Sequence, residues 1–226
     1  MILAATGLLR EGRILAGQGI RPLAGGGDPA RLLALLDRWA READGIISIG
    51  LCGALSPRLR PGDWVVAEAV LDGDERHAVD GPWASRLMEA LPGAAQGMQV
   101  GQDGMLTDAA GKAALHQATG ALGVDMESHV AARVALRHDL PFAVARVVSD
   151  DAGHDLPPAA EAGMRRDGGM DLAAVLRSLA RDPRQLPALI RTGWHAERAF
   201  RELLRGHHRL GPGLAGPAGA GDAGLV

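Results

Sequence analysis

Short apolar runs alternate with amphipathic segments along most of the chain, and this alternation restricts the folds open to it. The runs at 2–5 and 45–51 have the length and composition of buried strands. Residues 29–39 instead place leucines at helical spacing, after Asp28 as an N-cap and Pro29 at the first helical position. Such alternation predicts an α/β fold with helices on both faces of a mixed, largely parallel sheet.

The remaining elements follow from the same patterns. Further strands are predicted at 20–24, 64–70, 98–101, 121–125 and 141–148, and further helices at 83–91, 112–119, 127–138 and 171–205, the last interrupted near Pro183 and Pro187. A chain of 226 residues is long enough for one large core. We therefore expect a single domain at 1–210, followed by a disordered Gly-, Pro- and Ala-rich tail at 211–226.

Charge and cysteine content exclude several classes of protein. Lys and Arg total 24 against 27 Asp and Glu, so no basic surface for nucleic-acid phosphates is expected. Cys52 is the only cysteine, which rules out an internal disulfide and a cysteine-based zinc site and favours a reducing cytoplasm. No signal peptide or membrane-spanning run is evident, although attachment to a membrane surface stays open. His207 and His208 are expected to be solvated, and no metal is assigned.

Four predicted strand ends carry residues that could bind a ligand or take part in catalysis, at 6–11, 50–54, 125–128 and 149–152. In open α/β sheets ligands bind at the carboxyl ends of strands. If these ends share one rim, Glu11, Glu127 and Asp150 face one pocket without a nearby cysteine or a metal-type histidine pair. Such a set suits binding of sugar hydroxyls and proton transfer.

The same segments resemble the nucleoside phosphorylase and nucleosidase superfamily, which includes purine nucleoside phosphorylases and methylthioadenosine/adenosylhomocysteine nucleosidases. Val-Asp-Met-Glu-Ser at 124–128 and Arg-Val-Val-Ser-Asp at 146–150 are similar to the family's V-[DE]-M-E motif and its R-x-x-S-D strand end. Gly-Leu-Cys-Gly-Ala at 50–54 and Pro-Gly-Asp-Trp-Val at 61–65 resemble its glycine turn and following strand. The order and spacing of these motifs make the match specific. The resemblance implies a three-layer sandwich of the phosphorylase/hydrolase-like type.

The resemblance also implies roles for individual residues. Glu127 would accept hydrogen bonds from both ribose hydroxyls, and Met126 would lie against the sugar face. Asp150, oriented by Ser149, would give a proton to the purine as the glycosidic bond lengthens. Glu11 matches the acid that activates water in the hydrolytic branch of the family. Two further substrate-site residues follow from motif membership, Asp125 and Gly53.

Each of these residues also has a purely structural interpretation. Glu127 could be an acid favoured by the N-terminal dipole of a helix, and Asp150 a cap or turn residue. Met126 could belong to the core, and Glu11 could be a solvated surface acid. Cys52 is expected to be a small buried residue rather than a nucleophile. The flanking motifs favour the functional interpretation for Glu127 and Asp150.

The nucleophile is left open between phosphate and water. The family's phosphorylases place an Arg and a Ser where this chain has Ser48 and Leu51, and a leucine side chain cannot bind phosphate. No cofactor is expected, with phosphate as the possible co-substrate.

A substitute phosphate site is conceivable elsewhere in the chain. The backbone of Gly26 and Gly27, before a helix N-terminus, could cradle an anion together with Arg13, with Arg10 and Arg31 as alternatives. A plain flexible turn is the competing interpretation of the glycines.

One subfamily matches in more detail. The matching segments are Thr-Gly-Leu at 6–8 with Glu11 and Arg13, Gly-Gly-Gly-Asp-Pro-Ala-Arg at 25–31, Gly-Leu-Cys-Gly-Ala-Leu at 50–55, and Val-Asp-Met-Glu-Ser-His at 124–129. They resemble the hopanoid-associated phosphorylases. That resemblance implies removal of adenine from adenosylhopane, a nucleoside that carries a large polycyclic lipid. With four Trp, two Phe and no Tyr, the pocket should be aliphatic, and a lipid-linked substrate would require an apolar mouth at the periphery.

The leading hypothesis is therefore cleavage of the N-glycosidic bond of a purine (adenine) nucleoside. A catalytically silent nucleoside- or lipid-binding relative and a methylthioadenosine/adenosylhomocysteine-type nucleosidase are the alternatives. A dinucleotide-binding module is disfavoured because no G-x-G-x-x-G follows the first predicted strand. The resemblance further implies a homo-oligomer.

Overall fold

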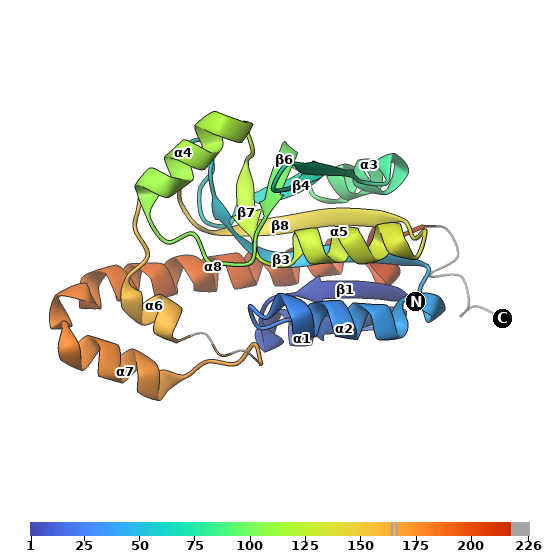
Figure 1. Ribbon diagram of the computed structural model, residues 1–226. Helices are drawn as coiled ribbons and strands as arrows, with labels where there is room; N and C mark the ends of the chain where they lie inside the picture. The colour runs from blue at the N-terminus through green and yellow to red at the C-terminus, as the bar shows by residue number, and fades with distance from the viewer. Residues whose placement is uncertain (164, 166, 218–226) are drawn as a thin grey trace.

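A mixed sheet runs through the described part of the chain, residues 1–163, 165 and 167–217 of a computed structural model (Figure 1). Its strands are β1 (Ile2–Thr6), β2 (Ile20–Ala24), β3 (Gly45–Ala54), β4 (Trp64–Asp72), β5 (Glu75–Ala78), β6 (Ala95–Gly101), β7 (Gly123–Asp125) and β8 (Phe142–Asp150). The pairs β1/β2, β1/β3, β3/β8, β4/β6 and β6/β7 are parallel, while β3/β7, β4/β5 and β4/β8 are antiparallel. The predicted mixed, largely parallel sheet is confirmed.

The sheet curls because β8 pairs with both β3 and β4. From β4 the pairing continues through β6 and β7 and returns to the end of β3, so five strands close into a ring. The parallel register of β3 and β8 runs from Ile46 opposite Phe142 to Cys52 opposite Val148. Closure brings the carboxyl ends of β3 and β8 beside the short strand β7.

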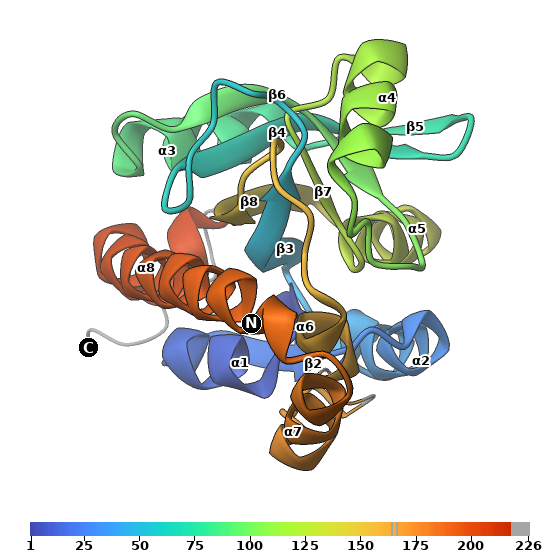
Figure 2. The same cartoon turned by 90° about the vertical axis from the view of Figure 1, so that its left-hand side faces the viewer.

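Helices cover both faces of the sheet. They are α1 (Leu9–Leu15), α2 (Pro29–Trp39), α3 (Gly81–Ala90), α4 (Ala109–Thr119), α5 (Ser128–Arg137), α6 (Pro158–Ala162), α7 (Leu172–Arg181) and α8 (Leu186–Leu210), with short 3-10 turns η1 (Ala40–Glu42), η2 (Pro183–Gln185) and η3 (Pro212–Ala215). Leu36 of α2 and Val134 of α5 belong to the core on one face. Trp83 of α3 and Leu203 of α8 belong to the core on the other, which α1 also covers (Figure 2).

The start of α2 follows the local sequence as predicted. Asp28 accepts a hydrogen bond from the backbone N–H of Arg31 at 3.0 Å, and Pro29 occupies the first turn of α2. Three elements were not predicted, namely α1, β5 and α6. The first and last are at most two turns long, and β5 (Glu-Arg-His-Ala) is a polar edge strand without apolar alternation.

The C-terminal segment differs from its prediction. Residues 211–217, expected to begin a disordered tail, pack on the domain: Leu214 is fully buried and its carbonyl accepts a hydrogen bond from Trp83 Nε1 at 3.0 Å. The Arg86 guanidinium donates to the carbonyl of Ala215 at 2.9 Å. Side chains of α3 thus anchor a segment whose own composition has no apolar periodicity. The rest of the predicted tail, 218–226, lies outside the described residues.

The length and polarity of the helices show whether any of them could span a membrane. Among the described residues, no helix combines the length and apolar character needed to cross a membrane.

Candidate active site

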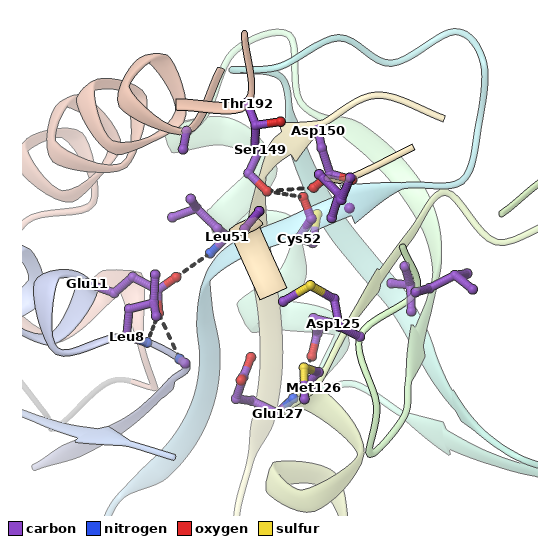
Figure 3. Close-up of a pocket in the computed structure, with 18 of the residues that line it drawn as sticks. Leu8, Glu11, Leu51, Cys52, Asp125, Met126, Glu127, Ser149, Asp150 and Thr192 are labelled. Atoms are coloured by element: carbon purple, nitrogen blue, oxygen red, sulfur yellow. Dashed lines mark hydrogen bonds between the residues drawn. The ribbon is translucent and has the colours of Figure 1, made fainter. Parts of the chain in front are cut away.

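Four chain segments meet around a pocket of about 250 Å³ (Figure 3). Gly7 and Leu8 follow β1, 51–53 lie near the end of β3, 125–127 follow from β7, and 149–150 end β8. These are the segments that the sequence placed on a common rim, and the structure brings them together. The strand β7 joins them although it is antiparallel to β3, because it overlaps β3 only at the last two residues of that strand.

An irregularity in β8 shapes the acidic end of the pocket. In the β3–β8 register Cys52 lies opposite Val148 but Gly53 lies opposite Asp150, so Ser149 is an extra residue on β8. Such bulges redirect side chains at strand ends. The Ser149 hydroxyl donates to the Cys52 carbonyl at 3.1 Å or to Asp150 Oδ1 at 2.8 Å, as the orienting role of Ser149 requires.

Glycines give the acidic side chains room to enter the pocket. A Cβ atom at Gly7 would lie 2.8 Å from Glu127 Oε1, and one at Gly53 would lie 3.1 Å from Asp150 Oδ2. Gly53 lines the pocket, as predicted, and its lack of a side chain is what admits the Asp150 carboxylate.

Glu11 is buried and held by backbone donors. Its Oε2 accepts hydrogen bonds from the N–H groups of Gly7 at 2.7 Å and Leu8 at 2.8 Å, and its Oε1 accepts one from Leu51 at 2.9 Å. Burial raises the pKa of Glu11, an effect that the Arg146 guanidinium and these donors oppose. A carboxylate offers about four acceptor positions, so roughly one remains for a ligand or a water molecule. The interpretation of Glu11 as a solvated surface acid is wrong.

Glu127 shares a buried guanidinium with Asp125. Arg146 Nη1 lies 3.1 Å from Glu127 Oε2, and Arg146 Nη2 lies 3.2 Å from Asp125 Oδ1. Burial raises the pKa of Glu127 to about 8, against the Arg146 charge and with the help of the negative charges of Asp125 and Glu11. One cation facing three carboxylates cannot compensate them all, so a proton is retained in this cluster near neutral pH.

Asp125 organises the turn rather than facing the pocket with its oxygens. Its carboxylate accepts from the backbone N–H groups of Glu127 at 2.9 Å and Ser128 at 2.7 Å, and from the Ser128 hydroxyl at 2.6 Å. Gln99 Nε2 donates to the same carboxylate at 2.8 Å. The Asp125 side chain is only 1% exposed. The structure therefore gives Asp125 a positioning role; the residue also belongs to the pocket lining, and its contact with substrate stays a prediction.

Asp150 is paired with a lysine that sequence reasoning missed. The Lys112 Nζ atom on α4 lies 2.6 Å from Asp150 Oδ2, and the lysine is fully buried. The same ammonium donates to the carbonyls of Asp151 at 3.1 Å and His154 at 3.3 Å. Nothing in the sequence signals this contact, because a single lysine in an alanine-rich helix is typical of a solvated face. Lys112 thus fixes the position of the Asp150 carboxylate beside the pocket.

Cys52 lies in the pocket wall, so the expectation of a pocket without a nearby cysteine is wrong. The residue is 4% exposed, and burial raises the pKa of its thiol, with the Asp125 charge adding to the effect. The thiol thus stays protonated and acts as a small apolar group, as expected of a small buried residue. Met126 also lines the pocket, between Asp125 and Glu127 (Figure 3).

The residues predicted to bind phosphate lie outside the pocket lining. Arg13 is exposed on α1, and the Gly26 N–H already donates to the Gly7 carbonyl at 2.8 Å. Gly27 belongs to the same turn before α2. Among the described residues that line the pocket there is no lysine, arginine or histidine, whereas four are acidic. The glycine turn thus adjoins the pocket through Gly7, but none of the residues predicted to bind phosphate belongs to the lining.

Apolar side chains form the remaining wall. They come from the loop before α4 and from the segment between β8 and the middle of α8: Met105, Leu106, Leu156, Ala160, Met170, Ala196 and Phe200, with Thr192 as the polar exception. The expectation of a mainly aliphatic pocket agrees with this lining. Their identity could not be predicted, because α6 was missed and the loops carry no periodic pattern.

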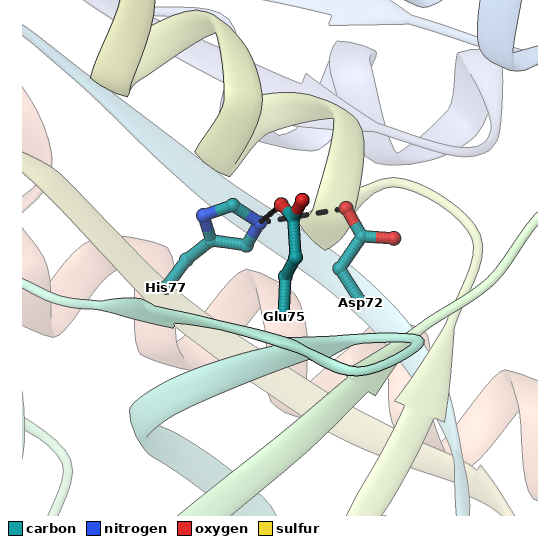
Figure 4. A group of neighbouring side chains, drawn as sticks. All are labelled: Asp72, Glu75 and His77. Carbon is teal, nitrogen blue, oxygen red and sulfur yellow. Dashed lines mark hydrogen bonds and ion pairs between the residues drawn. The ribbon is translucent and has the colours of Figure 1, made fainter.

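A second cluster of potential ligand atoms lies on the β4–β5 hairpin, away from the pocket (Figure 4). His77 Nε2 is 3.4 Å from Asp72 Oδ2 and 3.6 Å from Glu75 Oε2. Both oxygens of Asp72 already bind the Arg133 guanidinium, at 2.5 and 2.6 Å. A metal ion would have to compete with this bidentate pair, so the cluster is assigned as a structural ion network.

Comparison with known proteins identifies the family. The Phosphorylase superfamily model matches residues 6–181, and the chain therefore belongs to this superfamily. A search of curated proteins found no significant match.

Solved structures share the fold at low sequence identity. The 5′-methylthioadenosine/S-adenosylhomocysteine nucleosidase of Streptococcus pneumoniae is 15% identical, with a TM-score of 0.60 over 93% of this chain and 99% of that chain. The nucleosidase of Helicobacter pylori is 12% identical, with a TM-score of 0.61 over 92% of this chain and 98% of that chain. The nucleosidase of Neisseria meningitidis is 18% identical, with a TM-score of 0.59 over 92% of this chain and 98% of that chain. At such identities the likeness demonstrates the fold.

Proposed function

We propose that the protein hydrolyses the N-glycosidic bond of an adenine nucleoside. The observation that carries this proposal is the convergence of Glu11, Glu127 and Asp150 on one pocket, where Glu11 keeps roughly one acceptor position free. Membership of the superfamily and the similar fold of nucleosidases support it. One of those similar enzymes, from Streptococcus pneumoniae, was solved with 8-aminoadenine.

Each acid has a separate task in the proposed reaction. Glu127 accepts hydrogen bonds from the ribose hydroxyls, and Met126 packs on the sugar. As the bond between C1′ and the purine nitrogen breaks, its electron pair moves to the base, and Asp150 delivers a proton to a ring nitrogen. Water attacks C1′ and loses its proton to Glu11, whose remaining acceptor position suits a water molecule. The products are free adenine and the ribose.

The charge of the pocket favours water over phosphate as the nucleophile. Phosphate carries one to two negative charges near neutral pH, and the described lining offers four acidic side chains and no basic one. Leu51, where the family's phosphorylases use a polar residue, adds an apolar surface. Arg146 and Lys112 neutralise part of this acidic charge from behind the lining, and the carboxylate charge that remains would repel a phosphate ion.

The apolar wall supports a proposal for the class of substituent on the ribose. We infer a large apolar group at the 5′ position, with adenosylhopane as the proposed substrate and hopanoid biosynthesis as its setting. The wall that Leu156, Met170 and Phe200 help to form supports this inference, since it is apolar and reaches the surface. The second candidate is a methylthioadenosine/adenosylhomocysteine-type nucleosidase, which the fold of the similar solved enzymes favours.

Release of free adenine tests the proposal. Purified protein is incubated with adenosine, methylthioadenosine, adenosylhomocysteine and adenosylhopane, each with and without phosphate, and adenine is quantified by chromatography. We expect adenine from adenosylhopane at a rate independent of phosphate. A rate that requires phosphate would contradict hydrolysis. Tight binding of these nucleosides without adenine release would instead identify a catalytically silent relative.

Glu127→Gln is expected to raise KM by about ten- to a hundredfold, since hydrogen bonds to a charged group contribute roughly 1.5–3 kcal/mol. Because burial raises the pKa of Glu127 to about 8, the side chain is protonated below that pH and becomes a double acceptor above it. The wild-type kcat/KM should therefore rise with pH up to about 8, and Glu127→Gln should lose this rise. Initial rates measured across the pH range check both points.

The matched control is Glu68→Gln, which changes an exposed acid on β4 outside the pocket lining. It should leave KM and the pH profile unchanged. Wild-type KM and an unaltered profile in Glu127→Gln would refute the assignment of Glu127 to the ribose.

A further inference from the structure

Large apolar side chains are exposed where the pocket reaches the surface. They belong to α7, to the first half of α8 and to the residues just before α7: Met170, Leu172, Leu176, Leu186, Ile190 and Trp194, which are between 46% and 75% exposed. We call this set the α7–α8 apolar surface. Spacings of four residues put Leu172 with Leu176, and Leu186 with Ile190 and Trp194, on one face of their respective helices. Rows of large exposed apolar side chains on two helices near the pocket mouth are candidates for a binding surface.

This surface is continuous with the pocket. Met170 lines the pocket and is also 71% exposed. Thr192, on α8 between Ile190 and Trp194, lines it as well. Figures 1 and 2 show α7 and the start of α8 together at one end of the molecule, beside α6. No residue of α7 is buried, so its packing on the domain leaves much of the helix free for contact.

The same helices are strongly basic. Residues 172–210 contain eight arginines and three acids, in a chain whose net charge is −3. Arg177, Arg181 and Arg191 are exposed, and no ion-pair partner for them is found within the described part of the chain. Apolar side chains flanked by unpaired arginines are typical of helices that lie in the interface of an anionic membrane.

A second copy of the chain fits this surface less well. A two-fold interface brings the same patch of both subunits together, and here it would juxtapose two sets of unpaired arginines. An anionic lipid surface satisfies both the positive charge and the apolar side chains. We propose that the α7–α8 apolar surface docks the protein on anionic membranes, with the pocket mouth facing the lipid. Docking stands independently of catalysis, and only the delivery of a lipid-linked nucleoside rests on the proposed function.

Vesicle binding provides the test, with the fluorescence of Trp194 as a local reporter. Trp194 is 75% exposed, whereas Trp64 and Trp83 are buried and Trp39 is half-buried. Protein is mixed with vesicles of phosphatidylcholine alone or with added phosphatidylglycerol, and co-sedimentation and emission are measured. We expect binding and a blue shift with the anionic vesicles, both reduced by salt, and little binding to phosphatidylcholine alone.

Variants identify the surface that binds. Arg177→Gln combined with Arg181→Gln should weaken partitioning on the order of twentyfold, since each arginine near an anionic surface contributes a factor of about five. Ile190→Ser should also weaken it. The control is Leu136→Ser on α5, away from α7 and α8, which removes a side chain that is more exposed than Ile190, 74% against 48%. It should bind as the wild type does.

Two results would overturn the proposal. One is equal binding of the wild type and the arginine variant to anionic vesicles. The other is a dimer in solution that Ile190→Ser dissociates, with no vesicle binding by the wild type, because the surface would then be a subunit interface. Neither assay contains a nucleoside, so failure of docking is distinguishable from failure of the proposed hydrolysis, which adenine release measures in solution.

Discussion

Asp150→Asn is expected to lower kcat by about two to four orders of magnitude, the usual contribution of general acid–base catalysis, with little change in KM. The asparagine oxygen can still accept one of the hydrogen bonds that Asp150 receives from Lys112 at 2.6 Å and Ser149 at 2.8 Å. The amide cannot give a proton to the departing purine. Steady-state measurement of adenine release, once the substrate is established, checks this.

Asp74→Asn is the matched control, since Asp74 is exposed in the turn between β4 and β5. It should keep wild-type kinetics. If Asp150→Asn instead raised KM and left kcat unchanged, Asp150 would serve to hold the substrate, and the proton donor would have to be sought elsewhere.

Arg146→Met is expected to destabilise the fold by about 3–5 kcal/mol, because it leaves buried carboxylates without their counter-charge. The Arg146 guanidinium is fully buried and lies 3.2 Å from Asp125 and 3.1 Å from Glu127. It also donates to the Ser48 hydroxyl, so its loss removes hydrogen bonds as well. Urea denaturation followed by circular dichroism at neutral pH measures the change in the free energy of unfolding.

Arg137→Met tests whether the loss of stability in Arg146→Met is caused by the burial of its ion pairs. Arg137 is half exposed and pairs with Asp37 at 2.5 Å, and an ion pair at the surface contributes about 0–1 kcal/mol. A loss in Arg146→Met no larger than that in Arg137→Met would contradict the proposed role of the buried network.

Much of the scaffold was predictable because local patterns agree with the tertiary structure. The apolar run at 20–24 matches β2, and Asp28 with Pro29 begins α2 as its chemistry requires. The motif at 146–150 lies at the end of β8, where a parallel strand presents side chains to a ligand. Residues such as Glu11 and Glu127 could be nominated because their motifs lie at strand ends, and the structure places both in the pocket wall.

The sequence by itself determined the α/β alternation, the strand ends that carry acids and the family motifs, since these depend on residues close together in the chain. Only the tertiary structure decided what each acid touches. Lys112 meets Asp150 across 38 residues, and Arg146 joins Asp125 and Glu127 because β8 closes the ring of strands. It also decided that Gly26 and Arg13 lie outside the pocket lining. Contacts between distant residues depend on strand pairing and helix packing, which no local pattern encodes.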